Sequence, residues 1–265
     1  MKRWDPDLAF GLFLTGVVLL LMGTGLVHTP YDPNAMDAAG RFLGPGGTHL
    51  LGTDSFGRDN LSRIMLGMRY TFLVAFGTVA IGLAAGILLG MPAGWFGGAA
   101  DEAIMRLMDA MTSFPGILLA LVMVTVLDNG RYDILIALGI LFIPSFTRIA
   151  RSGVLQYREA EFVKSAQVFG AGWFRILFVH ILPNLAPQLL AAVVVGLSNA
   201  ILAESGMSYL GLGIQPPAAS LGRMLSEAQP FLFHSPWGAL APGLAIVTTV
   251  LGLNALGEGL GKRMG

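Results

Sequence analysis

Cysteine is absent from this chain of 265 residues. Its absence excludes disulfide bonds, thiolate metal sites and a cysteine nucleophile. Charged residues are also scarce, at 12% of the chain, whereas soluble domains carry about 25%. The 16 basic residues equal the 16 acidic ones in number, so there is no excess positive charge for binding nucleic acid.

Motifs of self-sufficient enzymes are missing as well. A phosphate-binding loop reads Gly-x-x-x-x-Gly-Lys-Ser/Thr, and the only lysine followed by serine, Lys164, lacks both glycines. Neither the Gly-x-Ser-x-Gly of hydrolases nor the His-Glu-x-x-His of zinc proteases occurs. We therefore expect no catalytic residues and no metal site in this chain, and any ATP would be hydrolysed by a partner.

Apolar residues dominate, at 54% of the chain with a mean hydropathy of +0.70. Such a composition is typical of an all-α polytopic membrane protein. A helix needs ~20 apolar residues to cross a bilayer. The six predicted transmembrane helices cover residues 8–27, 71–91, 104–127, 134–147, 185–209 and 238–256. The remaining parts are a head (1–7), an outer loop (28–70), a core (71–257) that includes an inner loop at 150–184, and a tail (258–265).

The first apolar run has a rival interpretation as a cleaved signal peptide. The apolar part of a signal peptide is only about 7–15 residues long and precedes an Ala-x-Ala site. Residues 8–27 are longer and lack that site, so we expect a retained transmembrane helix.

Three local features of the predicted helices lead to structural expectations. Gly82, Gly86, Gly90 and Gly94 lie four residues apart, a spacing that lets two helix backbones approach closely in lipid. Phe114-Pro115 should kink the third helix. Arg106 and Asp109 stand three residues apart and are expected to pair with each other.

The inner loop, 150–184, is long for a connection between two transmembrane helices. Phe162, Val163, Ala166 and Phe169 share one face of a short predicted helix, and Gly170 breaks it. A second short helix from Trp173 should end before Pro183 and Pro187, where the next span begins. Such a helix–glycine–helix unit suits docking into a groove of a soluble partner, or alternatively lying flat on the membrane surface.

Basic residues predict the orientation of the chain. Six spans place both termini on one side, and cytoplasmic segments are richer in Lys and Arg. With the start inside, the inner segments carry ten basic residues and the outer ones six. We therefore expect both termini and the inner loop in the cytoplasm.

The inner loop resembles the EAA loop of ABC-importer permeases. That pattern is Glu-Ala-Ala, three residues, Gly, about ten residues, and Leu-Pro; here it reads Lys164-Ser165-Ala166, Gly170 and Leu182-Pro183. Lys164 reverses the charge of the family's Glu. The peptide/nickel branch has a local form matched by Glu161-Phe162-Val163, Gly170-Ala171 and the segment 180–184.

A second stretch, Leu51-Gly52-Thr53-Asp54-Ser55-Phe56-Gly57-Arg58-Asp59, is similar to a signature in the first outer loop of the second-permease (C-type) subunit of that branch. From the residues alone, Asp59 is expected to cap a helix and Asp54 to pair with Arg58. The stretch is either a structural turn or a contact for substrate, and a structural role is the more frequent one for such turns.

Glu204, near the end of the fifth predicted span, is the clearest ionisable residue inside a span. Such residues mark transport pathways by default. The alternatives are a partner for a loop arginine and a position at the outer membrane interface.

The resemblance implies a type I ABC-importer permease fold in a bacterial or archaeal cytoplasmic membrane. It also implies a second homologous permease, two ATPases that bind ATP and Mg²⁺, and an outer substrate-binding protein. Substrates would be short peptides or nickel and other metal chelates. The residues expected to couple to the ATPases are Glu161, Phe162, Val163, Lys164, Ser165, Ala166, Phe169, Gly170, Ala171, Trp173 and Pro183. A self-sufficient secondary transporter or channel is the alternative; it should show inverted repeats and several charges at the bilayer midplane.

Overall fold

The computed structural model describes residues 6–127 and 133–264, and in these ranges the fold is helical, with one isolated bridge between Thr53 and Asp59. The helices are α1 (Pro6–Val27), α2 (Asn60–Phe96), α3 (Gly98–Thr112), α4 (Gly116–Val126), α5 (Asp133–Tyr157), α6 (Glu161–Val168), α7 (Trp173–Arg175), the π-helical η1 (Ile176–Ile181), α8 (Leu182–Tyr209), α9 (Leu221–Ala228), the 3-10 turn η2 (Gln229–Phe231) and α10 (Trp237–Met264).

Five helices in the described ranges are long and apolar enough to span a membrane, and a sixth span results if α3 and α4 are taken together. These two helices meet at an angle of 91°. Pro115 lies between them and has no N–H to continue a helix. The predicted kink at Phe114-Pro115 is therefore a full break. The all-α polytopic fold predicted from composition is confirmed.

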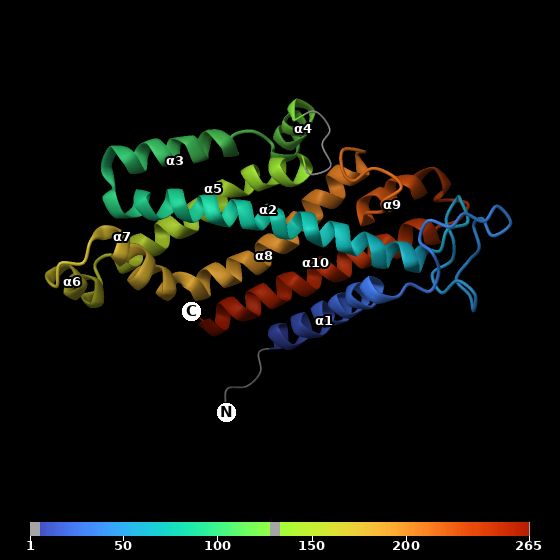
Figure 1. Ribbon diagram of the computed structural model, residues 1–265, viewed down its shortest axis with the longest axis horizontal. Coiled ribbons are helices and arrows are strands. Elements are labelled where there is room, and N and C mark those ends of the chain that lie inside the picture. Colours follow the sequence, from blue (N-terminus) through green and yellow to red (C-terminus); the bar gives the residue numbers. More distant parts are fainter. Residues whose placement is uncertain (1–5, 128–132, 265) are drawn as a thin grey trace.

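The long helices run roughly alongside one another, with α1 and α10 on one side of the bundle and α2, α3 and α5 on the other (Figure 1). The segment 28–59 and α9 gather at one end, which we call the loop end. Helices α6 and α7 lie at the opposite end, called the α6 end. The main core joins Phe72, Val79, Phe146, Ile201 and Leu253, which come from four helices.

Helix α2 has 37 residues, so it is about 55 Å long and exceeds the ~30 Å of the hydrocarbon core. It begins at Asn60, inside the predicted outer loop of residues 28–70. The predicted boundary at residue 71 marks the loss of charge and not the start of the helix. Asp59 is the N-cap, and its carboxylate accepts the Ser62 N–H at 2.8 Å, which confirms the expected cap.

The four glycines of α2 form the seam along which α5 packs. A Cβ on Gly82 would lie 2.8 Å from the Phe142 Cβ, and a Cβ on Gly94 would lie 2.8 Å from the Arg151 carbonyl oxygen. At Gly86 and Gly90 an added Cβ would overlap Phe146 and the Thr147 carbonyl. The predicted close approach of two backbones is confirmed, and α5 is the partner.

The predicted pairing of Arg106 with Asp109 is wrong. Arg106 pairs with Glu102, one turn earlier on α3, at 2.5 Å. Asp109 accepts a hydrogen bond from Arg148 of α5 at 2.9 Å. A separation of three residues allowed the predicted pair, but Arg106 pairs with the acidic residue one turn earlier on its own helix, and packing of α3 on α5 gives Asp109 its partner.

Small residues also set the register of α1 against α10. A Cβ on Gly259 would lie 2.8 Å from the Leu8 Cα, and one on Gly252 would lie 3.0 Å from the Thr15 N. The two helices are therefore antiparallel. Because α1 is uncharged from residue 8 to residue 27, its length gives a reference for the depth of residues on neighbouring helices.

Because Gly90 has no room for a Cβ, Gly90→Ala should force α2 and α5 apart. Overpacking costs about 1–3 kcal/mol, so we expect a melting temperature lowered by several degrees in detergent. Gly16→Ala is the matched control, because Gly16 lies in α1 with no atom within 4 Å of an added Cβ. Its melting temperature should be unchanged or raised. Equal stability of the two variants would contradict the packing described for the seam.

Candidate functional site

Residues 158–172, here called the α6 loop, project from the α6 end of the bundle (Figure 1). Helix α6 has eight residues and ends at Val168, with Phe169 as its C-cap. Gly170 follows with φ of +78°, a left-handed conformation that favours glycine. The Ala171 N–H donates to the Ala166 carbonyl at 3.0 Å, and the Gly170 N–H donates to the Gln167 carbonyl at 2.9 Å. These two bonds form a Schellman motif, which turns the chain sharply back.

One face of the α6 loop is buried against the bundle. Val163 is fully buried, and Ala166 and Ala171 pack on the same cluster. The other members come from three neighbouring helical segments: Met91, Ala150, Val154, Ile176, Leu177 and Ile181. This cluster is separate from the main core, so the α6 loop has a small apolar base of its own.

The tip of the loop is apolar and exposed. Val168 is 85% exposed and Phe169 is 89% exposed. Phe162 is partly covered by Tyr157, with ring centroids 6.2 Å apart. Trp173 packs edge-to-face on Phe96 at 5.3 Å, which joins the loop to the end of α2. Phe169 is therefore the most exposed aromatic residue of the loop.

The charged and polar residues of the loop lie on its surface. Lys164 pairs with Glu159 at 3.5 Å, and Arg158 also approaches Glu159 at 3.8 Å. Glu161 and Ser165 are exposed on α6. Lys164 thus finds an acidic partner within the loop itself, and its pair is a surface pair worth about 0–1 kcal/mol.

The expected second short helix does not end before the next span. Helix α7 runs through the π-helical η1 directly into α8, giving a single span from Trp173 to Tyr209. Pro183 lacks an N–H, and its ring would clash with the carbonyl four residues earlier in a regular α-helix. The wider π-helical turn, closed by the Leu182 N–H on the Leu177 carbonyl, accommodates the proline.

At the loop end, the turn at residues 51–59 is organised by Asp54. Its carboxylate accepts the N–H groups of Phe56 at 2.8 Å and Arg58 at 3.0 Å. The Arg58 Nε–H donates to its second oxygen at 2.6 Å, which confirms the expected pair. Asp59, besides capping α2, contacts the ring of His49 at 2.9 Å.

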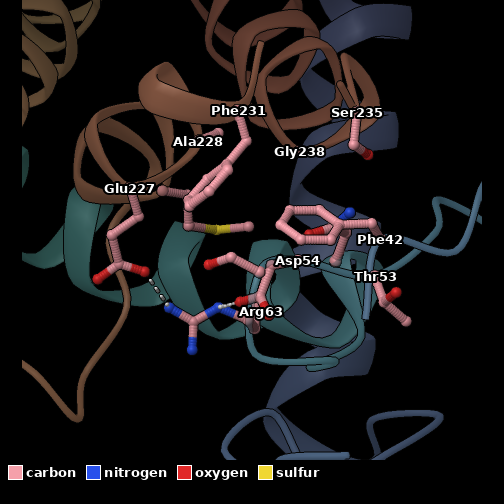
Figure 2. A pocket seen from close by; sticks show the side chains of 12 residues that line it. Phe42, Thr53, Asp54, Arg63, Glu227, Ala228, Phe231, Ser235 and Gly238 are labelled. Atoms are coloured by element: carbon pink, nitrogen blue, oxygen red, sulfur yellow. Dashed lines mark hydrogen bonds and ion pairs between the residues drawn. The ribbon is translucent and has the colours of Figure 1, made fainter. Parts of the chain in front are cut away.

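Glu227 of α9 completes this turn and was not predicted as a site residue. Its carboxylate accepts hydrogen bonds from Arg58 at 2.8 Å, Arg63 at 3.3 Å and Arg223 at 3.2 Å. Arg63 is only 2% exposed, and it also lies 3.6 Å from Asp54. Figure 2 shows Glu227 and Asp54 on opposite sides of the Arg63 guanidinium. The spacing of Arg223 and Glu227 was the available signal in the sequence.

The cavity beside these groups has a volume of about 20 Å³ and is lined by Phe42, Asp54, Arg63, Glu227 and Phe231 among others (Figure 2). A space of that size holds about one water molecule. It is too small for a peptide or a metal chelate. The geometry favours a structural role for Asp54, Arg58 and Asp59. Arg58, held by Asp54, joins the first loop to α9 through Glu227, and Asp59 joins the loop to the start of α2.

Glu204 of α8 is fully buried, and the Ser208 hydroxyl donates to it at 2.6 Å. The hydroxyls of Thr71, Ser205 and Ser220 lie around the same carboxyl. These groups come from α2, α8 and the N-cap of α9. In the described part of the chain, its surroundings are hydroxyls of three elements and not the loop arginine considered from sequence. No cluster of three or more potential metal ligands from His, Asp and Glu was found among the described residues.

The family profile described as "Binding-protein-dependent transport system inner membrane component" matches residues 86–265. This range contains the α6 loop, Glu204 and α9, while the turn at 51–59 precedes it.

Similar proteins extend the likeness over nearly the whole chain. The dipeptide transport system permease protein DppC of Haemophilus influenzae is 37% identical, covering 94% of this chain and 87% of the relative. The glutathione transport system permease protein GsiD of Pectobacterium atrosepticum is 37% identical, covering 97% and 86%. The nickel transport system permease protein NikC of Escherichia coli K12 is 34% identical, covering 98% and 93%.

Removing the Glu227 charge should destabilise the loop end. In Glu227→Gln, Arg58, Arg63 and Arg223 would lose a shared carboxylate. Removing one partner of a fully buried pair costs about 3–5 kcal/mol, and the 21% exposure of the Glu227 side chain places the expected cost below that range. We expect a marked fall in melting temperature for the purified protein. Glu102→Gln is the control, because the Glu102–Arg106 pair is exposed and worth about 0–1 kcal/mol. The same small effect in both variants would show that the arginines do not depend on Glu227.

Proposed function

The chain belongs to the family of binding-protein-dependent transport system inner membrane components and is a permease subunit of an ABC importer of the peptide/nickel class. On this premise, we propose that it passes short peptides or metal chelates into the cytoplasm. It is a multi-pass inner-membrane protein of a multi-subunit system. The proposed partners are a second homologous permease in a heterodimer, two ATPases, and an outer substrate-binding protein.

The exposed apolar tip on a rigid base carries this proposal. Val168 and Phe169 are exposed at the tip, while Val163 and Ala166 hold the opposite face on the bundle. An apolar helical tip that protrudes from a polar loop suits a groove on a soluble partner. Phe162, Lys164, Ser165, Gly170, Ala171 and Trp173 would form or shape the contact, and Pro183 would shape the exit into α8.

The α6 end is proposed to face the cytoplasm, and the loop end to face outward. The basis is the excess of Lys and Arg in the predicted inner segments, of which the one that contains α6 and α7 lies at the α6 end. In this orientation the α6 loop would reach ATPases in the cytoplasm, and the turn at 51–59 and α9 would face the substrate-binding protein.

In the proposed mechanism, partner ATPases bind ATP and Mg²⁺ and close on each other. Their movement would reach this chain through the α6 loop. The loop is packed on the ends of α2 and α5 and is continuous with α8 through η1, so a push at the tip would tilt these helices together. Substrate would then pass from the outer binding protein to the cytoplasm by alternating access.

The substrate class rests on the relatives, whose names refer to dipeptides, glutathione and nickel. A nickel substrate would pass as a chelate, because chelation supplies ligands that this chain would not need to provide.

A self-sufficient secondary transporter or channel is the alternative function. It would carry solute without an ATPase, and the α6 tip would then be indifferent to substitution. The first experiment below separates the two.

Replacing Phe169 with glutamate should abolish docking of the ATPases. A charge at the tip would have to be buried without a partner, which costs several kcal/mol. The matched control is Phe233→Glu, because Phe233 is also highly exposed but lies at the loop end, between Phe231 and His234, which contact Phe42. After co-expression with the ATPases and the second permease, we expect Phe233→Glu to retain the ATPases on affinity purification and Phe169→Glu to lose them at least tenfold.

Equal recovery of ATPase with both variants would argue against the α6 tip as the contact. Solute uptake by the purified chain alone in liposomes would favour the secondary transporter instead.

Single cysteines can test the proposed orientation, since the chain has none of its own. Phe233→Cys should react in intact cells or spheroplasts with a membrane-impermeant maleimide. Phe169→Cys should react only after the membrane is permeabilised. The reverse pattern would invert the proposed topology.

A further inference from the structure

Arg69 is an exposed cation on α2 at a depth where the surroundings of a membrane protein are apolar. The sequence-based boundaries placed it in the outer loop, but helix α2 already includes it. Among residues 6–127 and 133–264, none of the ion pairs involves Arg69, whereas Arg58, Arg63 and Arg223 share Glu227. Its role is therefore different from that of the loop-end arginines.

The depth of Arg69 follows from the contact between α1 and α2. A Cβ on Gly25 would lie 2.6 Å from the Met65 Cβ, so these two residues are level. Gly25 lies two residues before the end of α1 at Val27, and Arg69 is one turn beyond Met65. At 1.5 Å per residue, Arg69 lies about 9 Å below the end of the uncharged run of α1.

The side of α2 that carries Arg69 faces away from the core. Its neighbours Met68 and Phe72 are buried in the main core, at 1% and 3% exposure. Leu73, one turn from Arg69, is 45% exposed. A charged side chain inside a span is costly in lipid and normally faces a water-filled cavity or the interior of a bundle.

A cavity of about 490 Å³ lies along the same stretch of α2. It is lined by Leu66 and Tyr70, which lie three residues before and one residue after Arg69, and by Asn34, Val124 and the segment 212–218. Arg69 is next to this wall on α2 and is not itself one of the lining residues. The Gln215 side-chain amide donates to the carbonyls of Gly211 at 2.9 Å and Gly213 at 3.0 Å, so the wall formed by this segment is held in shape. The volume falls within the 300–1,000 Å³ typical of small-molecule sites.

We propose that Arg69 and this cavity form the outer part of the substrate passage, where Arg69 binds a carboxylate of the substrate. The guanidinium offers a fork of donors that matches a carboxylate in a bidentate pair. The carboxylate belongs either to the C-terminus of a peptide or to the chelator of a metal. This assignment rests on the proposed function and orientation, and it names the group of the substrate that this chain recognises.

Cysteine labelling tests the location of Arg69 without any knowledge of the substrate. Arg69→Cys would be introduced into the assembled importer and exposed to the anionic, membrane-impermeant reagent sulfonatoethyl methanethiosulfonate. Leu20→Cys is the depth-matched control, because Leu20 is 67% exposed on α1 at nearly the same level. Leu50→Cys, in the loop at residues 28–59, is the control for full access. We expect residue 69 to react at least tenfold faster than residue 20, and equally slow labelling would overturn the proposal.

Paired probes test the carboxylate. Uptake of trialanine and of its C-terminal amide would be measured in proteoliposomes with the complete importer, and so would uptake of nickel bound by histidine and by histidinamide. The relevant probe is the carboxylate-bearing one that the wild type transports. We expect Arg69→Gln to lower its uptake at least tenfold, and Arg69→Lys to lower its uptake less. Where the amide is also transported, its uptake should stay within twofold of wild type. The same substrate-binding protein is used throughout. Its preference among the probes therefore cancels when uptake by a variant is divided by uptake by the wild type for the same probe.

The probe that responds identifies the source of the carboxylate. An equal loss for acid and amide would overturn carboxylate recognition, even if labelling places Arg69 in the passage. A wild-type importer that transports neither carboxylate-bearing probe would overturn both this assignment and the proposed substrate class. If the ATPases still co-purify with the wild type and are lost in Phe169→Glu, the permease assignment stands and only the substrate assignment fails.

Discussion

The close contact of α2 with α5 is the constraint on which the other positions in this bundle depend. Lipid gives no hydrophobic drive for two apolar helices to associate, so packing of small residues must hold them together. Gly82, Gly86, Gly90 and Gly94 bring the α2 backbone against residues 142–154 of α5. Phe146 of α5 also reaches Gly196 of α8, so the same seam sets the position of the third long helix.

Two polar attachments hold α9 at the loop end, and they act at opposite ends of that helix. Its N-cap Ser220 lies near the buried Glu204, together with hydroxyls of α2 and α8. Its last turn carries Glu227, which holds Arg58 and Arg63. Inside the bundle, the neighbours of the carboxyl are hydroxyl groups, of which that of Ser208 donates a hydrogen bond to it. Near the polar end of the bundle, the contacts are ion pairs. The two kinds of contact thus match the depth at which each lies.

Local patterns in the sequence predicted the local features of the fold. Five of the predicted runs lie within long apolar helices, whereas the third covers two helices that meet at 91°. Asp59 capped α2 and Asp54 paired with Arg58, because each of these contacts depends on neighbours in the chain. The partner of Asp109 is Arg148, which lies 39 residues away, and only packing of α3 on α5 brings them together. Glu227 approaches Arg58 across 169 residues for the same reason. The helix predicted to end before Pro183 continues instead, because a π-helical turn can accommodate a proline ring that would clash in a regular α-helix.

That π-helical turn joins the two ends of the molecule mechanically. Helix α7, η1 and α8 form one rod from Trp173 beside the α6 loop to Tyr209 at the loop end. Glu204 is carried on this rod, and through Ser220 it contacts the start of α9. In the proposed mechanism, a tilt of this helix at the α6 end would move the wall of the outer cavity, since the segment 212–218 follows shortly after α8. A continuous helix with one widened turn is enough to connect the proposed ATPase contact with the proposed carboxylate site, without a separate relay of side chains.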